Sequence, residues 1–188
     1  GTPLDSESGR LRQTQVVIGR RSDAPPSAFP VQQARFVPSP PGSDLQAGLQ
    51  QLVDWMRADR RDQIDPVVAA AMSHYEFEAL HPFRDGNGRI GRLLIVLYLQ
   101  AVGVLSEPTL TVSPWFEARR GEYYDHLLGV SPNGAWDDYI RFFALGLQQA
   151  GRGPCRRHNS RSRCGRRPDW QHDDHGAGRF HDRDPAGY

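Results

Sequence analysis

Residues 81–92 read His-Pro-Phe-Arg-Asp-Gly-Asn-Gly-Arg-Ile-Gly-Arg and concentrate most of the groups in this chain that could do chemistry. The proline that follows His81 disfavours helical geometry at the histidine, so we expect its ring at a helix end, facing a loop. Gly86, Asn87 and Gly88 then lead into an apolar helix, whose first turn has unpaired backbone N–H groups and a dipole that favours an anion. The pattern predicts a phosphate-binding loop beside a histidine that titrates near neutral pH.

The charged residues of the same segment suit a ligand with several phosphates. Arg89 and Arg92 lie on neighbouring positions of the first helical turn, where the helix dipole favours acidic rather than basic side chains. Two arginines placed against the dipole therefore indicate a polyanionic ligand. Asp85 adds a carboxylate suited to Mg²⁺, which keeps most of its waters and bridges phosphates. Together these residues predict a nucleoside triphosphate site, and the missing lysine and Ser/Thr exclude a P-loop.

Each of these residues also has a purely structural explanation. A single histidine at a helix end is most often a cap or a surface residue, and Gly-Asn-Gly is most often a turn. Arg92 alone could donate to a salt bridge in the core. The combination of all these residues within twelve positions favours a functional site over these separate explanations.

Five helices are expected to position this segment. The first begins at residue 43 with Ser43 or Asp44 as its cap, and its apolar residues recur on one face. The second begins at 65–66, where an aspartate precedes a proline at the first helical position. The others span residues 89–101, 113–128 and 136–149, and the continuous apolar run of 93–97 predicts a central helix buried on most sides.

Extended segments precede these helices. Residues 15–18 and 34–37 have short strand-like runs that could pair as a hairpin or flap. The expected organisation is an N-terminal extended segment over 1–42, a helical core over 43–150 and a tail over 151–188. The tail contains no Leu, Ile, Val or Met, so we expect it to be disordered, and out-of-frame translation would explain its abrupt composition. The spacing of its Cys and His residues matches no usual zinc site.

Composition excludes several classes of protein. No apolar run approaches the length of a membrane-spanning helix, and the first twelve residues lack the pattern of a secretory signal, so a cytoplasmic location without membrane contact is expected. Residues 1–150 hold 14 arginines against 17 acidic residues. This mildly acidic balance predicts no nucleic-acid partner.

The segment 81–92 resembles the signature of the Fic family, His-x-Phe-x-Asp/Glu-Gly-Asn-Gly-Arg-x-x-Arg, and matches every defining position. The resemblance extends over about residues 9–149 and is closest to bacterial Fic domains. It rests also on residues 74–78, 36–38, 9–10, 17–19, Tyr123-Tyr124 and Trp136. It implies an all-α fold, namely a Fic-domain helical bundle with a small β-hairpin flap.

The resemblance implies an adenylyltransferase that transfers AMP from ATP to a Ser, Thr or Tyr hydroxyl of a target protein, with Mg²⁺ and release of pyrophosphate. His81 would be the general base, and Asp85 would hold Mg²⁺. The backbone of Gly86 to Gly88 with the Asn87 side chain would form the anion hole.

The remaining implied contacts lie outside this loop or at its end. Arg89 and Arg92 would neutralise the outer phosphates. Tyr123 and Tyr124 are candidates for lining the base end of the nucleotide pocket. The flap that binds the target as an added strand would consist of Ala34, Arg35, Phe36 and Val37.

Alternative functions stay open at this point. An inactive, truncated Fic fragment could bind nucleotide or target without turnover, and a related transferase could use another nucleotide or phosphoryl donor. The chain lacks the Ser/Thr-x-x-x-Glu-Gly/Asn motif of the family's inhibitory helix, whose glutamate pairs with the second motif arginine, here Arg92. This copy could therefore be derepressed, or it could rely on an antitoxin-like inhibitor or on self-association.

Overall fold

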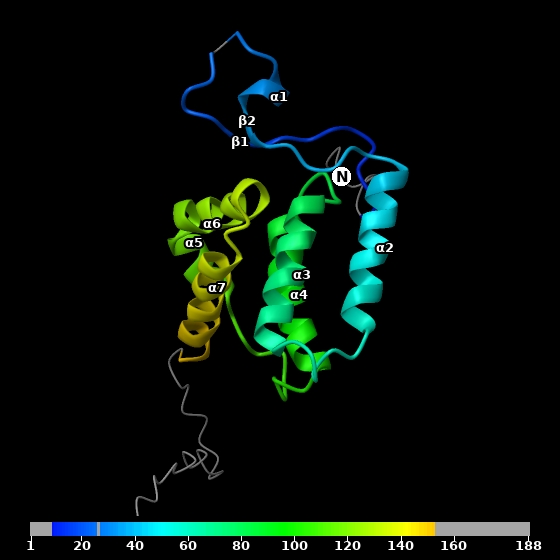
Figure 1. Cartoon of the computed structure of the whole chain (residues 1–188), viewed down its shortest axis with the longest axis vertical. Coiled ribbons are helices and arrows are strands. Elements are labelled where there is room, and N and C mark those ends of the chain that lie inside the picture. Colours follow the sequence, from blue (N-terminus) through cyan, green and yellow to red (C-terminus); the bar gives the residue numbers. More distant parts are fainter. Residues whose placement is uncertain (1–8, 26, 153–188) are drawn as a thin grey trace, which may run out of the picture. The chain divides into compact units, whose positions relative to one another are not determined.

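The computed structural model describes residues 9–25 and 27–152, and most of these residues form helices (Figure 1). The expected all-α fold with a small β-hairpin is confirmed. The elements in chain order are β1 (Ile18–Arg20), α1 (Pro30–Gln33), β2 (Ala34–Phe36), α2 (Ser43–Arg57), α3 (Pro66–Leu80), α4 (Asn87–Ala101), α5 (Ser113–Ala118), α6 (Arg120–Asn133) and α7 (Trp136–Gly151). Beyond residue 152, the predicted tail lies outside the described residues.

Helices α3 and α4 pack against each other in the middle of the helical part, with α2 on one side of α3 and α5 to α7 on the other (Figure 1). The expected start of α3 is confirmed, because the Asp65 carboxylate accepts hydrogen bonds from the N–H groups of Val67 and Val68. Three consecutive alanines, 69–71, are buried on α3 and let neighbouring helices approach closely. Tyr139 of α7 is fully buried and donates a hydrogen bond of 3.0 Å to the Ala71 carbonyl.

Two predictions about where helices begin and end are wrong in part. The single helix expected over 113–128 is divided at Arg119, whose N–H bonds the carbonyl of Phe116, three residues back. This change of direction lets Phe116 insert into the core while α6 follows another path. The first long helix begins as expected at Ser43, but its cap is Gly42 and no side chain caps it.

Helix α4 is not buried on most sides. Its inner face, which includes Gly91 and Ile95, packs against the core, whereas Ile90, Leu93 and Leu97 are exposed. A continuous apolar run predicts a helix in contact with the core, but it does not determine how many neighbours cover that helix. In the described part of the chain, α3 is the main neighbour of α4, and it covers one face.

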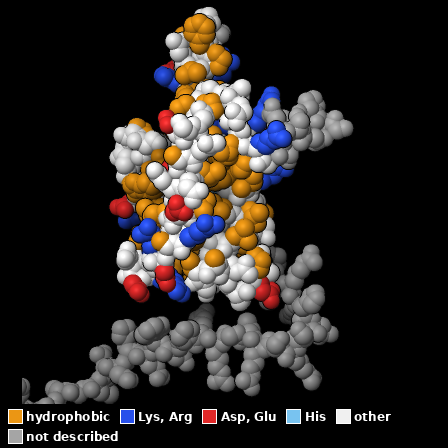
Figure 2. Space-filling model, turned by 90° about the vertical axis from the view of Figure 1, so that its right-hand side faces the viewer, with side chains coloured by type: hydrophobic (Ala, Val, Ile, Leu, Met, Phe, Trp, Pro, Cys, Tyr) orange, Lys and Arg blue, Asp and Glu red, His pale blue; other side chains and the backbone are white. Residues whose placement is uncertain are grey.

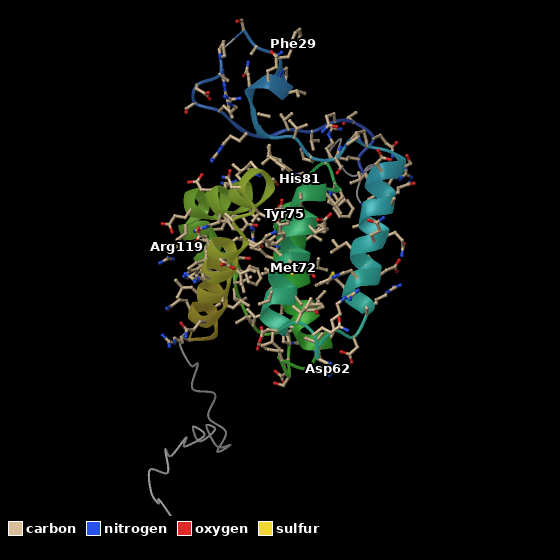
Figure 3. All side chains as sticks on the ribbon, viewed as in Figure 1. Phe29, Asp62, Met72, Tyr75, His81 and Arg119 are labelled. Atoms are coloured by element: carbon tan, nitrogen blue, oxygen red, sulfur yellow. The ribbon has the colours of Figure 1, made fainter. Side chains whose placement is uncertain are left out.

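The predicted hairpin forms, but its first strand starts later than expected. Ile18 pairs with Phe36 and Arg20 with Ala34 in an antiparallel register. Residues 15–17 do not join the ladder, and there the Gln15 side-chain amide donates to the Pro38 carbonyl. Apolar side chains reach the surface at the tip of this segment, where Phe29 is 75% exposed (Figures 2 and 3).

Within the described ranges, none of the helices combines the length and the apolar character that crossing a membrane requires.

Candidate active site

His81 lies at the end of α3 in an unusual backbone conformation. Its φ of 47° and ψ of 59° are left-handed, and no other non-glycine residue among those described has a positive φ. The helix ends here because Pro82 cannot follow a helical residue without a clash. Figure 3 shows His81 at the top of α3, next to the segment that carries the hairpin. A left-handed conformation is costly for histidine, so neighbouring groups must hold it.

Arg12 supplies that support. Its side chain is buried, with 4% exposed, and Nε donates a hydrogen bond of 2.8 Å to the His81 carbonyl. Nη2 donates to the carbonyls of Leu80, at 3.3 Å, and Ser39, and the Arg12 N–H donates to the Pro82 carbonyl. These contacts satisfy carbonyls that the end of α3 would leave without partners. Sequence reasoning missed Arg12, because its neighbourhood contains other arginines and no pattern distinguishes it.

The surroundings of the His81 ring favour its neutral form. Burial is the main cause that lowers the pKa of this imidazole, and the positive charge of Arg12 lowers it further. The backbone of Glu78 opposes this shift. The Nδ1 atom is buried and has no hydrogen-bond partner among the described residues. A neutral imidazole at this position can accept a proton from a hydroxyl that enters the site.

The Asn87 side chain joins the two ends of the loop that follows His81 by hydrogen bonds to Phe83. The Asn87 side chain is buried, and its Oδ1 accepts a hydrogen bond of 2.9 Å from the Phe83 N–H while Nδ2 donates to the Phe83 carbonyl at 2.7 Å. Both ends of the amide are therefore used within the loop, although Nδ2 has a second N–H beyond the one that bonds Phe83, and the expected contribution of the Asn87 side chain to an anion hole stays a prediction. The backbone N–H groups of Asn87 and Gly88 have no partner among the described residues, so they can bind an anion.

Gly86 is required at the start of α4. It caps the helix with a left-handed φ of 85°, a conformation that glycine adopts without strain. Its N–H donates to Oδ1 of Asp85 at 2.6 Å. This turn aims the following N–H groups away from the helix body.

Asp85 and Arg89 lie at the outside of the loop. Their closest charged atoms, Oδ2 and Nη2, are 3.6 Å apart, and both side chains are largely exposed. In the described ranges no three His, Cys, Asp or Glu side chains gather as a metal site. One exposed carboxylate fits Mg²⁺ only as a ligand that shares the ion with phosphates and water, which is the usual arrangement at phosphate sites.

Arg92 extends from the first turns of α4 toward α5. Nε donates to the Ser113 Oγ at 3.1 Å, and Nη2 lies 3.1 Å from Oε1 of Glu117. A Cβ built on Gly88 would lie 3.2 Å from Nη1, so the guanidinium is next to the anion loop. Ser113 and Glu117 were not among the residues predicted for the site, because their only signal in the sequence is a spacing of four residues in a helix.

A cavity of about 280 Å³ opens beside His81 and brings part of the predicted site together. Seven predicted residues line it: His81, Gly88, Arg92, Tyr123, Tyr124, Arg35 and Phe36. Six do not, namely Asp85, Gly86, Asn87, Arg89, Ala34 and Val37. The residues that sequence reasoning missed are Ile18, Gly19, Tyr75, Glu78, Ala79, Arg120, Leu127, Leu128 and Ser131. The cavity thus has a charged end near Arg92 and an apolar end along α6.

A buried polar cluster forms the floor of the site. His74 Nε2 and the Tyr123 hydroxyl are 2.7 Å apart, so Tyr123 is a core residue as well as a cavity residue. Burial lowers the pKa of His74 to about 4 and raises that of Glu78 to about 7. A Cβ on Gly91 would lie 2.6 Å from Glu78 Oε1, and therefore only glycine fits between α3 and α4 here.

The hairpin is tied to the helices across the cavity. Arg35 of β2 forms an ion pair with Asp125 of α6, with 2.5 Å between Nη2 and Oδ1. The aliphatic part of the Arg35 side chain lies on Gly19 of β1. This ion pair places β2 at the mouth of the cavity, although Ala34 faces the interior and Val37 lies beyond the strand.

Comparison with known proteins identifies the family. The sequence pattern of the Fic/DOC family matches residues 4–99, about half of the chain. Protein adenylyltransferase Fic of Drosophila grimshawi is 32% identical over 138 residues, which cover 73% of this chain and 24% of that protein. Protein adenylyltransferase fic-1 of Caenorhabditis elegans is 37% identical over 138 residues, with 73% and 23% covered.

Solved structures agree with this match. A Fic family protein from Desulfovibrio desulfuricans G20 has a TM-score of 0.63 at 30% identity and covers 80% of this chain and 42% of its own. For Fic-1 of C. elegans the TM-score is 0.55 at 30% identity, with 79% and 37% covered. The protein is a Fic-fold domain and belongs to the Fic/DOC family. It spans about a quarter of the length of the curated relatives it matches.

Proposed function

We propose that this chain is the catalytic domain of a protein adenylyltransferase, which transfers AMP from ATP to a serine, threonine or tyrosine hydroxyl of a target protein. The observation that carries the proposal is one cavity lined by His81, whose pKa is lowered by burial, by Gly88, whose N–H has no partner among the described residues, and by Arg92. The names of the relatives support it, because those proteins are adenylyltransferases.

His81 acts as the general base. Its ring takes the proton of the target hydroxyl as the hydroxyl oxygen bonds to the α-phosphorus of ATP. The bond between that phosphorus and the oxygen that bridges to the β-phosphate breaks, and pyrophosphate leaves. The lowered pKa keeps the imidazole unprotonated, and the Arg12 contacts fix the backbone that carries it.

The anion loop and Arg92 stabilise the phosphates. The N–H groups of Asn87 and Gly88 would bind phosphate oxygens at the N-terminus of α4, and the guanidinium of Arg92 would bind the outer phosphates. Arg89 adds positive charge from the exposed side of the loop. Asp85 is the residue that would hold Mg²⁺, which when bound neutralises charge on the phosphates.

The hairpin is the proposed docking site for the target backbone. Strand β2 has an edge that is not paired with β1, and an extended segment of a target could add to it as a further strand. Arg35 and Phe36 line the cavity next to that edge, so a hydroxyl on an added strand would enter near His81. An antitoxin-like inhibitor, self-association and a cytoplasmic location stay predictions.

The test compares the purified chain with its His81→Ala variant. Both are incubated with Mg²⁺ and ATP labelled in the α-phosphate, alone and with a bacterial lysate, and labelled proteins are examined by intact mass. The proposal expects a gain of one AMP unit only when His81 is present. His126→Gln, which changes a histidine outside the cavity, is the matched control and should retain labelling.

One result would contradict the assigned base and another the function. Equal labelling by the His81→Ala variant would exclude His81 as the base. Folded protein that binds ATP but labels nothing would favour a binding domain without turnover, and the same assay with other nucleotides would then test a different donor.

A further inference from the structure

Arg92 carries five N–H donors in a planar fork, and helix α5 uses the donors on one edge. Nε donates to Ser113 and Nη2 pairs with Glu117, both at 3.1 Å. These two nitrogens are adjacent on the side-on edge of the guanidinium. Its other donors, both on Nη1 and the second on Nη2, are left for another partner.

Those remaining donors lie next to the anion loop. A Cβ on Gly88 would be only 3.2 Å from Nη1, so no side chain fits between the guanidinium and the loop backbone. The N–H of Gly88 has no partner among the described residues. An anion bound to this N–H would therefore meet the end of the Arg92 fork as well.

Helix α5 is a rigid support for the two contacts. Ser113 and Glu117 are four residues apart and share one face of the helix. Phe116, between them, is buried and packs against Tyr123 and Phe143 of two other helices. Because the core holds Phe116, α5 cannot shift without disturbing it, and the positions of Ser113 and Glu117 are correspondingly fixed.

We propose that Ser113 and Glu117 are positioning residues, which hold the side-on edge of Arg92 so that its remaining donors face the outer phosphates of the nucleotide. This inference rests on the proposed function for the identity of the ligand. The Arg92 side chain is 12% exposed and that of Glu117 is 51% exposed, so the carboxylate reaches Arg92 from the solvent side. Neither Ser113 nor Glu117 lines the cavity, and neither would touch the nucleotide.

The test measures binding of Mg·ATP and of AMP by calorimetry. AMP lacks the outer phosphates, so it reports on the rest of the site. Glu117→Ala and Ser113→Ala should each weaken ATP binding by about tenfold, the scale of a charge-assisted hydrogen bond, and leave AMP binding unchanged. Glu117→Gln keeps an oxygen acceptor and should restore most of the ATP affinity. Glu122→Ala, an exposed glutamate on α6, is the matched control.

A double-mutant cycle separates positioning from general stability. In an Arg92→Ala background, Glu117→Ala should cause no further loss of ATP affinity, because its partner is already absent. An equal further loss, an equal loss of AMP binding, or tighter ATP binding by Glu117→Ala would overturn the proposal. If Glu117→Ala does not fold, Ser113→Ala, alone and in the Arg92→Ala background, gives the same comparison.

These measurements do not depend on group transfer. Wild-type protein that binds ATP in this pattern but labels no target would contradict the adenylyltransferase function alone. Transfer that is normal in every variant, with unchanged ATP affinity, would contradict the positioning role alone.

Discussion

Nε of Arg12 and the carbonyl oxygen of His81 are joined by a hydrogen bond of 2.8 Å, across 69 positions of sequence. The same guanidinium donates to the carbonyls of Leu80 and Ser39. Arg12 therefore connects the end of α3, the base of the hairpin and the backbone of the proposed catalytic base. It stabilises a left-handed histidine that the local sequence would not hold by itself.

Replacing Arg12 by methionine should destabilise the fold. Four buried or part-buried carbonyls, those of Thr14, Ser39, Leu80 and His81, would lose their donor, and we expect the free energy of unfolding to fall by about 2–3 kcal/mol. Urea unfolding followed by tryptophan fluorescence measures this. Arg10→Met removes an exposed arginine two residues away and should change the stability little. Similar losses in the two variants would contradict the role of Arg12.

Activity should persist below the pH at which an ordinary histidine becomes protonated. Because burial and Arg12 lower the pKa of His81, kcat/KM should fall only as the pH drops through a value below 6.5. Removing the positive charge in Arg12→Met raises that pKa, so the acidic limb should move to higher pH. NMR titration of the His81 ring follows the same change without turnover. If the acidic limb of Arg12→Met moved to lower pH instead, the positive charge of Arg12 would not be a cause of the lowered pKa of His81.

Glu78 should make stability depend on pH. Its carboxyl ionises near pH 4.5 when exposed, whereas burial raises its pKa in the fold to about 7. The stabilisation from this group is complete below pH 4.5 and is lost as the pH rises through 7. Glu78→Gln lacks this loss, so relative to wild type it should gain about 2 kcal/mol of unfolding free energy between pH 5 and pH 8.

Urea unfolding of both proteins at the two pH values provides the comparison. His74 also titrates with an altered pKa, of about 4, and its stabilisation is lost as the pH falls from 6.5. That contribution is present in both proteins and largely cancels in the difference. If the difference in unfolding free energy between Glu78→Gln and wild type stayed constant between pH 5 and pH 8, the Glu78 carboxyl would not have a raised pKa in the fold.

Two glycines in helices should respond oppositely to alanine. In Gly91→Ala the new Cβ would lie 2.6 Å from Glu78 Oε1, and overpacking of this kind destabilises by about 1–3 kcal/mol. In Gly121→Ala the Cβ meets nothing within 4 Å, and the gain in helix propensity should stabilise by about 0.5–1 kcal/mol. Thermal unfolding of the pair decides this, and a stabilised Gly91→Ala would contradict the close packing.

Most helix starts and the anion loop could be predicted because their causes are local. Asp65 and Pro66 begin α3 through contacts within one turn. Pro82 ends the helix because a proline disfavours helical geometry at the residue before it, His81. The loop of residues 86–88 owes its free N–H groups to its place at a helix start. The break at Arg119 and the exposed side of α4 were not predictable, since they depend on what the core accepts and on which neighbours are present.

The sequence alone determined which residue types the proposed site contains: a histidine, a carboxylate, an anion loop and two arginines lie within twelve residues, because they belong to one continuous segment. Only the tertiary structure decided which other residues hold His81 and Arg92 in place. Arg12, Ser113 and Glu117 reach their partners across 69, 21 and 25 positions, and nothing in their local surroundings distinguishes them. Helix capping and turn formation act over a few residues, whereas these contacts exist only because the tertiary fold brings the segment of Arg12 to the end of α3 and the start of α4 to α5.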